Sequence, residues 1–272
     1  MQKYKFIFVI LTYRSYEDIQ ECINSISACY DSYKIVVVNS FFDSASKGIF
    51  EKIARDNHCD FINVENKGYS YGNNIGIKYV REKYLFDFLI ISNPDIVIKK
   101  NAFNYQKFLE NPVVIAPCIT TRTGKHQNPY WVVENKTAER LIYIGFKKRN
   151  SLIAYTGFAI NKLIRIVFIA YTNLFRKKIN KVFAAHGSFI IFNRKVFEKL
   201  NVIYDENMFL FAEEALLAHR LKQNNIPILY TNEIEIYHKE DGSVGIAHID
   251  EKSILRKSII YYFEYLKQSK EV

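Results

Sequence analysis

Apolar runs alternate with helical patterns through the first 116 residues. Several runs, such as Ile35-Val36-Val37-Val38, are continuous, which is typical of strands covered on both faces. This order predicts repeated βα units and a mostly parallel sheet in a nucleotide-binding α/β layer sandwich. We expect strands at residues 4–11, 34–38, 60–64, 86–91 and 113–116, and helices at 16–28, 44–57, 71–83 and 101–109.

The pattern changes after an exposed loop at residues 120–125. Residues 152–175 form a long apolar stretch that contains Lys162 and Arg165 and lies between the basic runs 147–149 and 176–178. Two interpretations stay open: a helix lying in a membrane interface, or a buried helical pair with two surface cations. In both cases residues 147–178 are a helical insertion.

The last third returns to a compact pattern. It predicts a strand broken by Gly187 at 182–192, helices at 194–200 and 212–223, strands at 226–230 and 233–238, and an amphipathic helix at 249–266. We divide one continuous domain into a nucleotide-binding half (1–120), a second half with the insertion (121–245) and a C-terminal helix (246–272).

Composition and charge narrow the class of protein. A chain of 272 residues that is 49% hydrophobic can bury a substantial core, and its net charge of +10 favours an anionic partner. The basic residues lie beside apolar ones and no nucleic-acid-binding motif appears, which argues against nucleic acid. The short apolar run at 6–11 is better explained as a first strand than as a signal sequence. No CxxC pair occurs, so we expect reduced thiols in a cytosolic protein at Cys22, Cys29, Cys59 and Cys118.

Asn93-Pro94-Asp95 follows the apolar run at 86–91. Pro94 cannot donate to a sheet ladder, so the strand should end here with Asp95 at its carboxyl end. Ligands bind at that end of an open parallel sheet, and a carboxylate there can hold a divalent cation that bridges a diphosphate. The alternative is a simple turn that leaves the core.

Residues 66–76 contain three glycines and several asparagines between a predicted strand and helix. The glycines permit close backbone approach, and the asparagines can hydrogen-bond a base, ribose or phosphate. A tight turn with close helix packing is the alternative.

Glu213-Glu214 opens a predicted helix. Glu214 shares a helical face with Leu217 and Leu221 and should point toward the protein, whereas Glu213 could pair with Arg220. The helix dipole favours an ionised carboxylate here, as a general base requires, although acidic residues are also common in a first helical turn.

His238 ends a strand-like run. It could ligate a metal or contact a phosphate, with Lys239 and Ser243 as further phosphate contacts. A plain surface or core histidine is the alternative.

The order of these motifs resembles the family 2 glycosyltransferases, particularly the bacterial rhamnosyltransferase-like members. The resemblance covers residues 4 to about 245 and is most specific at Asn93-Pro94-Asp95 and at residues 209–214. It is carried by Ile10-Leu11-Thr12-Tyr13, residues 66–76, Ser92-Asn93-Pro94-Asp95, His186-Gly187-Ser188-Phe189, Tyr204-Asp205-Glu206 with 209–214, and His238 with Ser243.

This resemblance implies a GT-A-type nucleotide-diphospho-sugar transferase fold, with a mixed, mostly parallel sheet flanked by helices, and inversion at the anomeric carbon. It implies Glu214 as the base, and Asp95 with His238 as ligands of Mg²⁺ or Mn²⁺. Residues 121–245 become the acceptor-binding and catalytic half, with His186, Gly187 and Glu213 toward the acceptor. The implied donor-binding residues are Thr12, Tyr13, Asn66, Gly68, Gly72, Asn73 and Asn93.

The chain departs from the family pattern at three positions. The family usually has aspartate at the position of Glu214, and often an acidic residue where this chain has Leu216. Its second strand normally ends in Asp-Asn, so either Asn39 or Asp43 takes over the nucleotide contact.

The resemblance predicts sugar transfer from dTDP-rhamnose or a UDP-hexose to an undecaprenyl-linked acceptor or a cell-surface polysaccharide such as capsule or O-antigen. We expect a cytosolic enzyme, peripheral on the inner face of the membrane if the insertion contacts lipid. The rival hypotheses are a sugar nucleotidyltransferase and a non-catalytic paralogue that acts as an assembly partner. The sequence indicates no oligomeric state.

Overall fold

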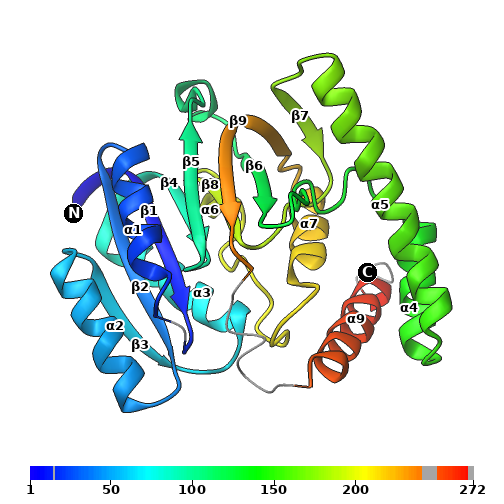
Figure 1. The fold of residues 1–272 in the computed structure, drawn as a ribbon, viewed down its shortest axis with the longest axis horizontal. Helices are drawn as coiled ribbons and strands as arrows, with labels where there is room; N and C mark the ends of the chain where they lie inside the picture. Colours follow the sequence, from blue (N-terminus) through cyan, green and yellow to red (C-terminus); the bar gives the residue numbers. More distant parts are fainter. Residues whose placement is uncertain (15, 241–249, 269–272) are drawn as a thin grey trace.

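The computed structural model describes residues 1–14, 16–240 and 250–268, which fold around one nine-stranded mixed sheet (Figure 1). The strand order is β3-β2-β1-β4-β8-β6-β9-β5, with β7 paired to β9. Most of the paired residues lie in parallel ladders, which confirms the predicted α/β fold with a mixed, mostly parallel sheet. The strands are β1 (Gln2–Thr12), β2 (Tyr33–Phe41), β3 (Asp60–Glu65), β4 (Tyr84–Ser92), β5 (Ile96–Asn101), β6 (Val114–Thr121), β7 (Ile179–Val182), β8 (Phe189–Asn193) and β9 (Ile228–His238).

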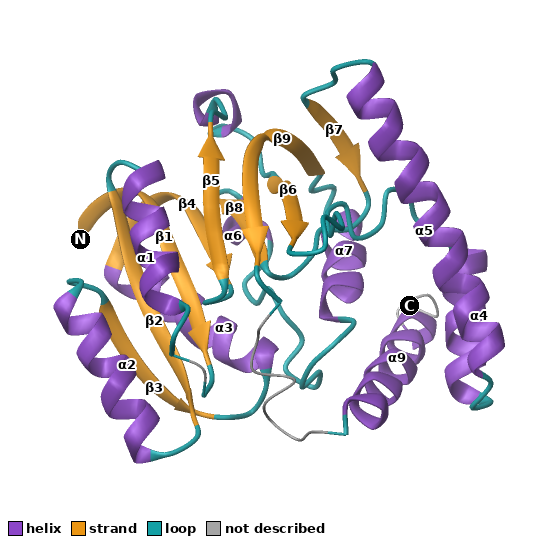
Figure 2. Cartoon of the chain, in the orientation of Figure 1, coloured by secondary structure: helices purple, strands orange, loops and turns teal. Residues whose placement is uncertain are grey.

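Helices flank the sheet, and three of them stand together beyond its β7 end (Figure 2). These three are α4, α5 and α9, of which α5 is the longest element of the described chain. The helices are α1 (Ile19–Cys29), α2 (Ser44–Asp56), α3 (Tyr69–Lys83), α4 (Lys136–Lys147), α5 (Ser151–Leu174), α6 (Val196–Lys199), α7 (Glu213–Gln223) and α9 (Glu251–Gln268).

The sheet separates two apolar cores. Successive side chains of a strand point to opposite faces, so Phe6 and Phe8 of β1 enter one core while Ile7 and Val9 enter the other. Both sets are almost fully buried. Continuous apolar strands are therefore required here, as the sequence pattern predicts.

The predicted helix at residues 101–109 is wrong. The chain instead forms the strand β5 and then a single 3₁₀ turn, η1 (Tyr105–Phe108). The apolar spacing in this segment serves aromatic packing, because Phe103 stacks on Phe108 and meets Tyr105 edge-on. β5, which pairs with β9, ends at Asn101 and so overlaps the predicted helix by one residue only.

The two strands expected at 226–230 and 233–238 are one strand, β9. Its register against β6 shifts between Pro117 and Cys118, so one continuous strand carries the irregularity that the sequence suggests as a break. The shift lets β9 pair with β7 through its first half and with β5 through its second.

One edge of the sheet collects the chain segments of interest. The carboxyl ends of β1, β4, β6 and β9 point the same way (Figure 1), and β8 starts at this edge. The strand before Asn93-Pro94-Asp95 ends at Ser92, as predicted. Functional side chains from distant parts of the sequence therefore meet here.

Candidate active site

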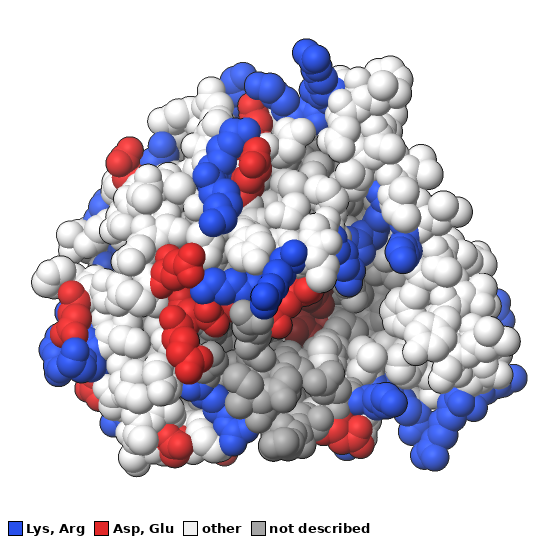
Figure 3. Space-filling model, in the orientation of Figure 1, with Lys and Arg blue, Asp and Glu red and all other residues white. Residues whose placement is uncertain are grey.

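A cavity of about 480 Å³ lies at this edge, which is a typical size for a small-molecule site. In Figure 3 the molecular surface is hollowed between the sheet and the α4–α5 side. Eleven of the predicted site residues line the cavity: Thr12, Tyr13, Asn66, Gly68, Asn93, Asp95, His186, Gly187, Glu213, Glu214 and His238.

Asp95 and His238 form a buried pair in this cavity. His238 Nε2 lies 3.2 Å from Asp95 Oδ2, and the two side chains are 8% and 3% exposed. The backbone fixes their approach, because Lys239 N donates to Asp95 O at 3.1 Å where β5 pairs with β9. Two residues far apart in the sequence are thus presented as one unit.

Gln127 orients the imidazole of this pair. Its Oε1 lies 2.6 Å from His238 Nδ1, while its Nε2 donates to Glu240 Oε1 at 2.8 Å. Since Gln127 Oε1 can only accept, the network puts the Nδ1 proton toward Gln127, and Nε2 is the ring nitrogen that faces Asp95 and the cavity. Neutral imidazole in this tautomer is a suitable metal ligand.

Asp95 and His238 fit a divalent cation whose remaining ligands come from a bound substrate. In the described part of the chain no group of three or more His, Cys, Asp or Glu side chains could hold a metal ion. Mg²⁺ commonly takes one or two protein ligands and completes its shell with substrate phosphates and water. Asp95 and His238 would supply those protein ligands, and a diphosphate would supply the others.

Glu214 also lines the cavity, from the start of α7. Its Oε1 accepts a hydrogen bond from Gly187 N at 3.2 Å. A Cβ on residue 187 would lie 2.9 Å from this oxygen, so glycine allows the backbone to approach the carboxylate. Burial raises the pKa of Glu214 above 4.5, which makes its carboxylate a stronger base.

Glu213 lies beside Glu214 and does not pair with Arg220, so that expectation is wrong. Arg220 instead donates to the carbonyls of Val202 and Ile203. Glu213 Oε2 is buried and has no hydrogen-bond partner in the described structure. Both acidic side chains of the motif therefore face one cavity.

The backbone before these glutamates is strained. Phe211 and Ala212 both have positive φ, at 71° and 64°, which non-glycine residues rarely adopt. Ala212 is the N-cap of α7 and has no side chain to cap the helix. Such strain is concentrated at functional sites, where the surrounding structure stabilises it. Here Ser258 of α9 helps, because its hydroxyl donates to Leu210 O at 2.7 Å.

Glu213 is expected to make the protein less stable as the pH rises. Burial, and then the Glu214 charge, raise the pKa of Glu213 well above 4.5. Between these two values the folded state binds more protons than the unfolded state, so the free energy of unfolding falls with increasing pH. Glu213→Gln should therefore be more stable than the parent at mildly alkaline pH, by about 1.4 kcal/mol per pKa unit removed.

Urea unfolding at a series of pH values would measure this difference. It should shrink as the pH falls through 4.5, because below this value the parent's Glu213 is protonated in both states. Glu51→Gln, an exposed position on α2, is the matched control and should show no such trend. A difference that is independent of pH would contradict this explanation.

Gly68 sets the shape of the loop that contacts Phe209. Its φ is +99°, and a Cβ would lie 2.3 Å from Phe209 O, so only glycine fits. The next residue, Tyr69, donates its backbone N–H to the same oxygen at 2.8 Å and its hydroxyl to Gly187 O at 2.7 Å. The glycine-rich loop is thereby tied to both segments that hold Glu214.

His186 is a neutral polar group in the cavity. Burial, with a smaller effect from His238, lowers its pKa to about 3. Its Nδ1 accepts from Ser188 N at 3.2 Å, so the remaining proton resides on Nε2. His186 can therefore donate one hydrogen bond to a substrate without carrying charge.

Five predicted positions in the described structure do not line the cavity. Asn39 is buried and donates to Asn63 Oδ1, and Asp43 caps α2 by accepting from Ser46 N. Lys239 pairs with Asp18 and Glu21. Gly72 lies where a Cβ would meet Leu11, and Asn73 donates to Tyr69 O, so both serve helix packing. Ser243 lies outside the described residues.

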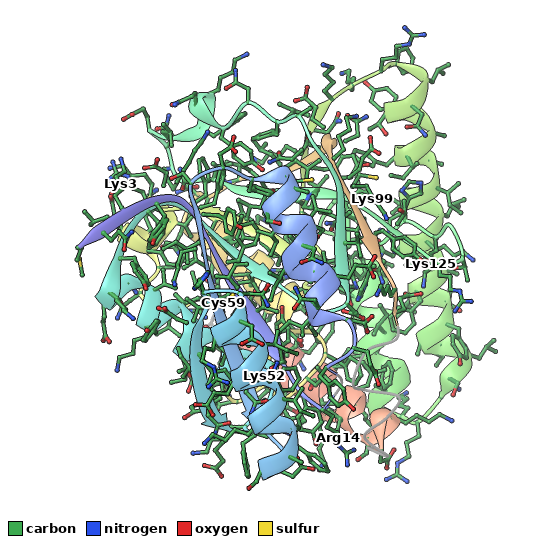
Figure 4. The ribbon with its side chains drawn as sticks, turned by 60° about the vertical axis from the view of Figure 1, so that its left-hand side comes forward. Lys3, Arg14, Lys52, Cys59, Lys99 and Lys125 are labelled. Carbon is green, nitrogen blue, oxygen red and sulfur yellow. The ribbon has the colours of Figure 1, made fainter. Side chains whose placement is uncertain are left out.

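Several cavity residues have no distinctive sequence signal. Gln127 follows the loop at 120–125 and could not be singled out without knowing that β6 lies beside β9. Ser40 offers a hydroxyl at the end of β2 next to Asn66, at 3.4 Å. Arg14, labelled in Figure 4, does not line the cavity, and its guanidinium lies 3.7 Å from the centroid of the Phe42 ring. Gln127 and Ser40 therefore add polar groups to the cavity beyond those that the motifs indicate.

Residues 7–201 match the family model of glycosyl transferase family 2. Among curated relatives, the low-salt glycan biosynthesis hexosyltransferase Agl10 of Haloferax volcanii is 26% identical over 235 residues, 85% of this chain and 66% of its own length. The rhamnosyltransferase WbbL of Escherichia coli K12 is 23% identical, over 97% of this chain and 94% of that protein.

Solved structures show the same fold at low identity. GalNAc-T7 with UDP, GalNAc and Mn²⁺ has a TM-score of 0.59 at 13% identity, over 88% of this chain and 44% of that one. Residues 1–349 of S. aureus TarS in complex with UDP-GlcNAc have a TM-score of 0.52 at 16% identity. This match covers 90% of this chain and 61% of the TarS chain. The likeness extends across the sheet and its helices and establishes a GT-A-like architecture.

Proposed function

Since this chain belongs to glycosyl transferase family 2, whose members transfer sugars from nucleotide-sugar donors, we propose that it is a metal-dependent, inverting hexosyltransferase. The observation that carries this proposal is the cavity itself, which both Glu214 and the Asp95–His238 pair line. A displacement at an anomeric carbon needs a base and a diphosphate site in one cavity.

In the proposed reaction an acceptor hydroxyl attacks the anomeric carbon of the donor. The new glycosidic C–O bond forms as the bond from that carbon to the β-phosphate oxygen breaks, and its electron pair leaves with the nucleoside diphosphate. Glu214 takes the proton of the hydroxyl, while Gly187 N–H holds the carboxylate in place. A divalent cation bound by Asp95 and His238 would offset the charge on the diphosphate.

We propose dTDP-rhamnose or a UDP-hexose as the donor and a lipid-linked or cell-surface glycan as the acceptor. Support comes from the relatives, one named a rhamnosyltransferase and one a glycan-biosynthesis hexosyltransferase. The solved structures with UDP or UDP-GlcNAc favour a uridine nucleotide. Thr12, Asn66 and Asn93 lie where such a donor would enter.

A panel of nucleotide sugars tests this function. With Mn²⁺ or Mg²⁺, one donor should raise the melting temperature and release its nucleoside diphosphate slowly by hydrolysis, because a bound ligand stabilises the folded state. Chelation should abolish both effects. A sugar nucleotidyltransferase would instead release pyrophosphate from a nucleoside triphosphate and sugar phosphate. A protein that neither binds nor hydrolyses any donor would be a non-catalytic paralogue.

A further inference from the structure

The long helix α5 presents apolar side chains both to the protein and away from it. Its fully buried residues, Ala154, Gly157, Asn161 and Thr172, are small or polar, and Ile160, Phe168 and Ile169 pack against the core beside them. Those on the opposite face recur at helical spacing and are large and apolar, with exposures from 40% to 77%: Leu152, Tyr155, Leu163, Ile166, Val167, Tyr171 and Leu174. We refer to these seven residues as the outer face of α5.

The inner face is fixed to the protein. Gly145 of α4 lies against Ala154, and Gly157 lies against Ala138, so close approach of α4 needs glycine on both helices. Asn161 Nδ2 donates to Tyr130 O at 3.0 Å, and Arg165 donates to His126 O. The expected buried helical pair is therefore wrong: residues 152–175 belong to one helix that packs on α4, and its outer face is uncovered within the described structure.

The segment that carries this face has charges of a single sign, although Lys178 at its end pairs with Glu233 at 3.0 Å. Residues 140–178 contain nine Lys and Arg and no Asp or Glu, against a net charge of +10 for the whole chain. The cations cluster at the two ends of α5, in Lys147-Lys148-Arg149 and Arg176-Lys177-Lys178, with Lys162 between them. Figure 3 shows this side of the molecule as an uncharged strip with basic side chains at its upper and lower ends.

We propose that the outer face of α5 docks on the surface of an anionic lipid bilayer. An apolar stripe bounded by cations fits the boundary between acyl chains and anionic headgroups, where a helix lies parallel to the surface. A second copy of this face is a poor match, because it would bring two equally cationic surfaces together. A helix that spans the bilayer is also a poor match, because insertion of α5 would break the hydrogen bonds that Asn161 and Arg165 donate to the preceding loop.

The docked orientation has a consequence for the cavity. The loop bound by α5 is the one that carries Gln127, a cavity residue. Lys125, labelled in Figure 4 on the α5 side, extends the basic surface toward the same loop. A membrane-bound α5 would therefore hold the cavity close to the bilayer, within reach of an acceptor whose lipid is embedded there. Docking itself does not depend on the proposed transferase activity.

Vesicle co-sedimentation of the full chain tests the proposal. At low salt the protein should sediment with vesicles of phosphatidylcholine and phosphatidylglycerol, bind phosphatidylcholine alone far less, and dissociate as salt screens the charges. The double variant L163E/I166E should lower the partition coefficient at least tenfold. Leu85→Glu is the matched control, because Leu85 is 51% exposed on β4 and Ile166 is 56% exposed, and it should bind like the parent.

Thermal unfolding of all variants would verify that they fold, and nucleoside diphosphate release without vesicles would report the transferase site separately. The proposal is overturned if the parent stays in solution with anionic vesicles, or if L163E/I166E binds them as the parent does. It is equally overturned if light scattering without lipid shows a dimer that L163E/I166E dissociates, or if bound protein resists alkaline carbonate extraction as a spanning protein does.

Discussion

Replacing Glu214 by glutamine is expected to lower the turnover number by about 10²- to 10⁴-fold while donor affinity stays near that of the parent. The amide keeps the shape of the side chain and can still accept from Gly187 N, but it cannot remove the proton of the acceptor hydroxyl. Initial rates of nucleoside diphosphate release with acceptor present would measure the turnover, and calorimetric titration would measure donor binding.

Two further variants sharpen this result. Glu214→Asp should keep part of the activity, because aspartate is usual at this position in the resembling family and retains a carboxylate. Glu213→Gln should keep more activity than Glu214→Gln if the assignment is correct. Near-parental turnover in Glu214→Gln with intact donor binding would remove the assignment, and a selective loss in Glu213→Gln would transfer the role to its neighbour.

Asp95→Ala is expected to abolish metal-dependent binding of the donor and to lower kcat/KM by on the order of 10²-fold or more, since a metal supplies several kcal/mol of charge stabilisation to a leaving group. Asp95 is the one carboxylate that touches His238 Nε2 in the described structure. Without it, His238 alone would have to hold the cation. The measurement is the rise in melting temperature on adding donor with Mn²⁺, compared with donor alone.

The control for Asp95→Ala is Asp56→Ala, at the exposed end of α2 and far from the cavity. It should bind donor and metal as the parent does. His238→Gln should weaken the metal effect less than Asp95→Ala, because a carboxylate is the stronger ligand for Mg²⁺. Undiminished metal-dependent donor binding in Asp95→Ala would show that the cation is held elsewhere.

Much of the fold could be predicted from the sequence because its first half is built from local signals. Continuous apolar strands and amphipathic helices alternate there, and each element forms close to its predicted bounds. The predictions fail in segments that pack on or pair with residues far away in the sequence. β5 forms because β9 lies beside it, and the apolar spacing of residues 101–109, which predicts a helix, instead packs aromatic rings together.

The cavity residues also divide into those that local motifs identify and those whose role depends on distant contacts. Motif order is sufficient to single out Asp95, Glu214 and His238, and the tertiary structure brings all three to one cavity. Residue type alone is insufficient for Asn39, Asp43 and Lys239. Each has the right chemistry for a nucleotide or phosphate contact, yet each is engaged in a structural hydrogen bond or ion pair with a neighbour that the sequence does not identify.

By itself the sequence determined the βα order, the ends of its central strands and the residue types that could carry the chemistry, because these depend on short-range periodicity and on the conformational limits of proline and glycine. The tertiary structure decided which groups meet: that His238 faces Asp95, that Gln127 contacts the other ring nitrogen of His238, and that α5 leaves one apolar face exposed. Those outcomes depend on strand register and on helix packing between distant segments. A shift of one residue in the register of a strand would move each of its side chains to the other face of the sheet.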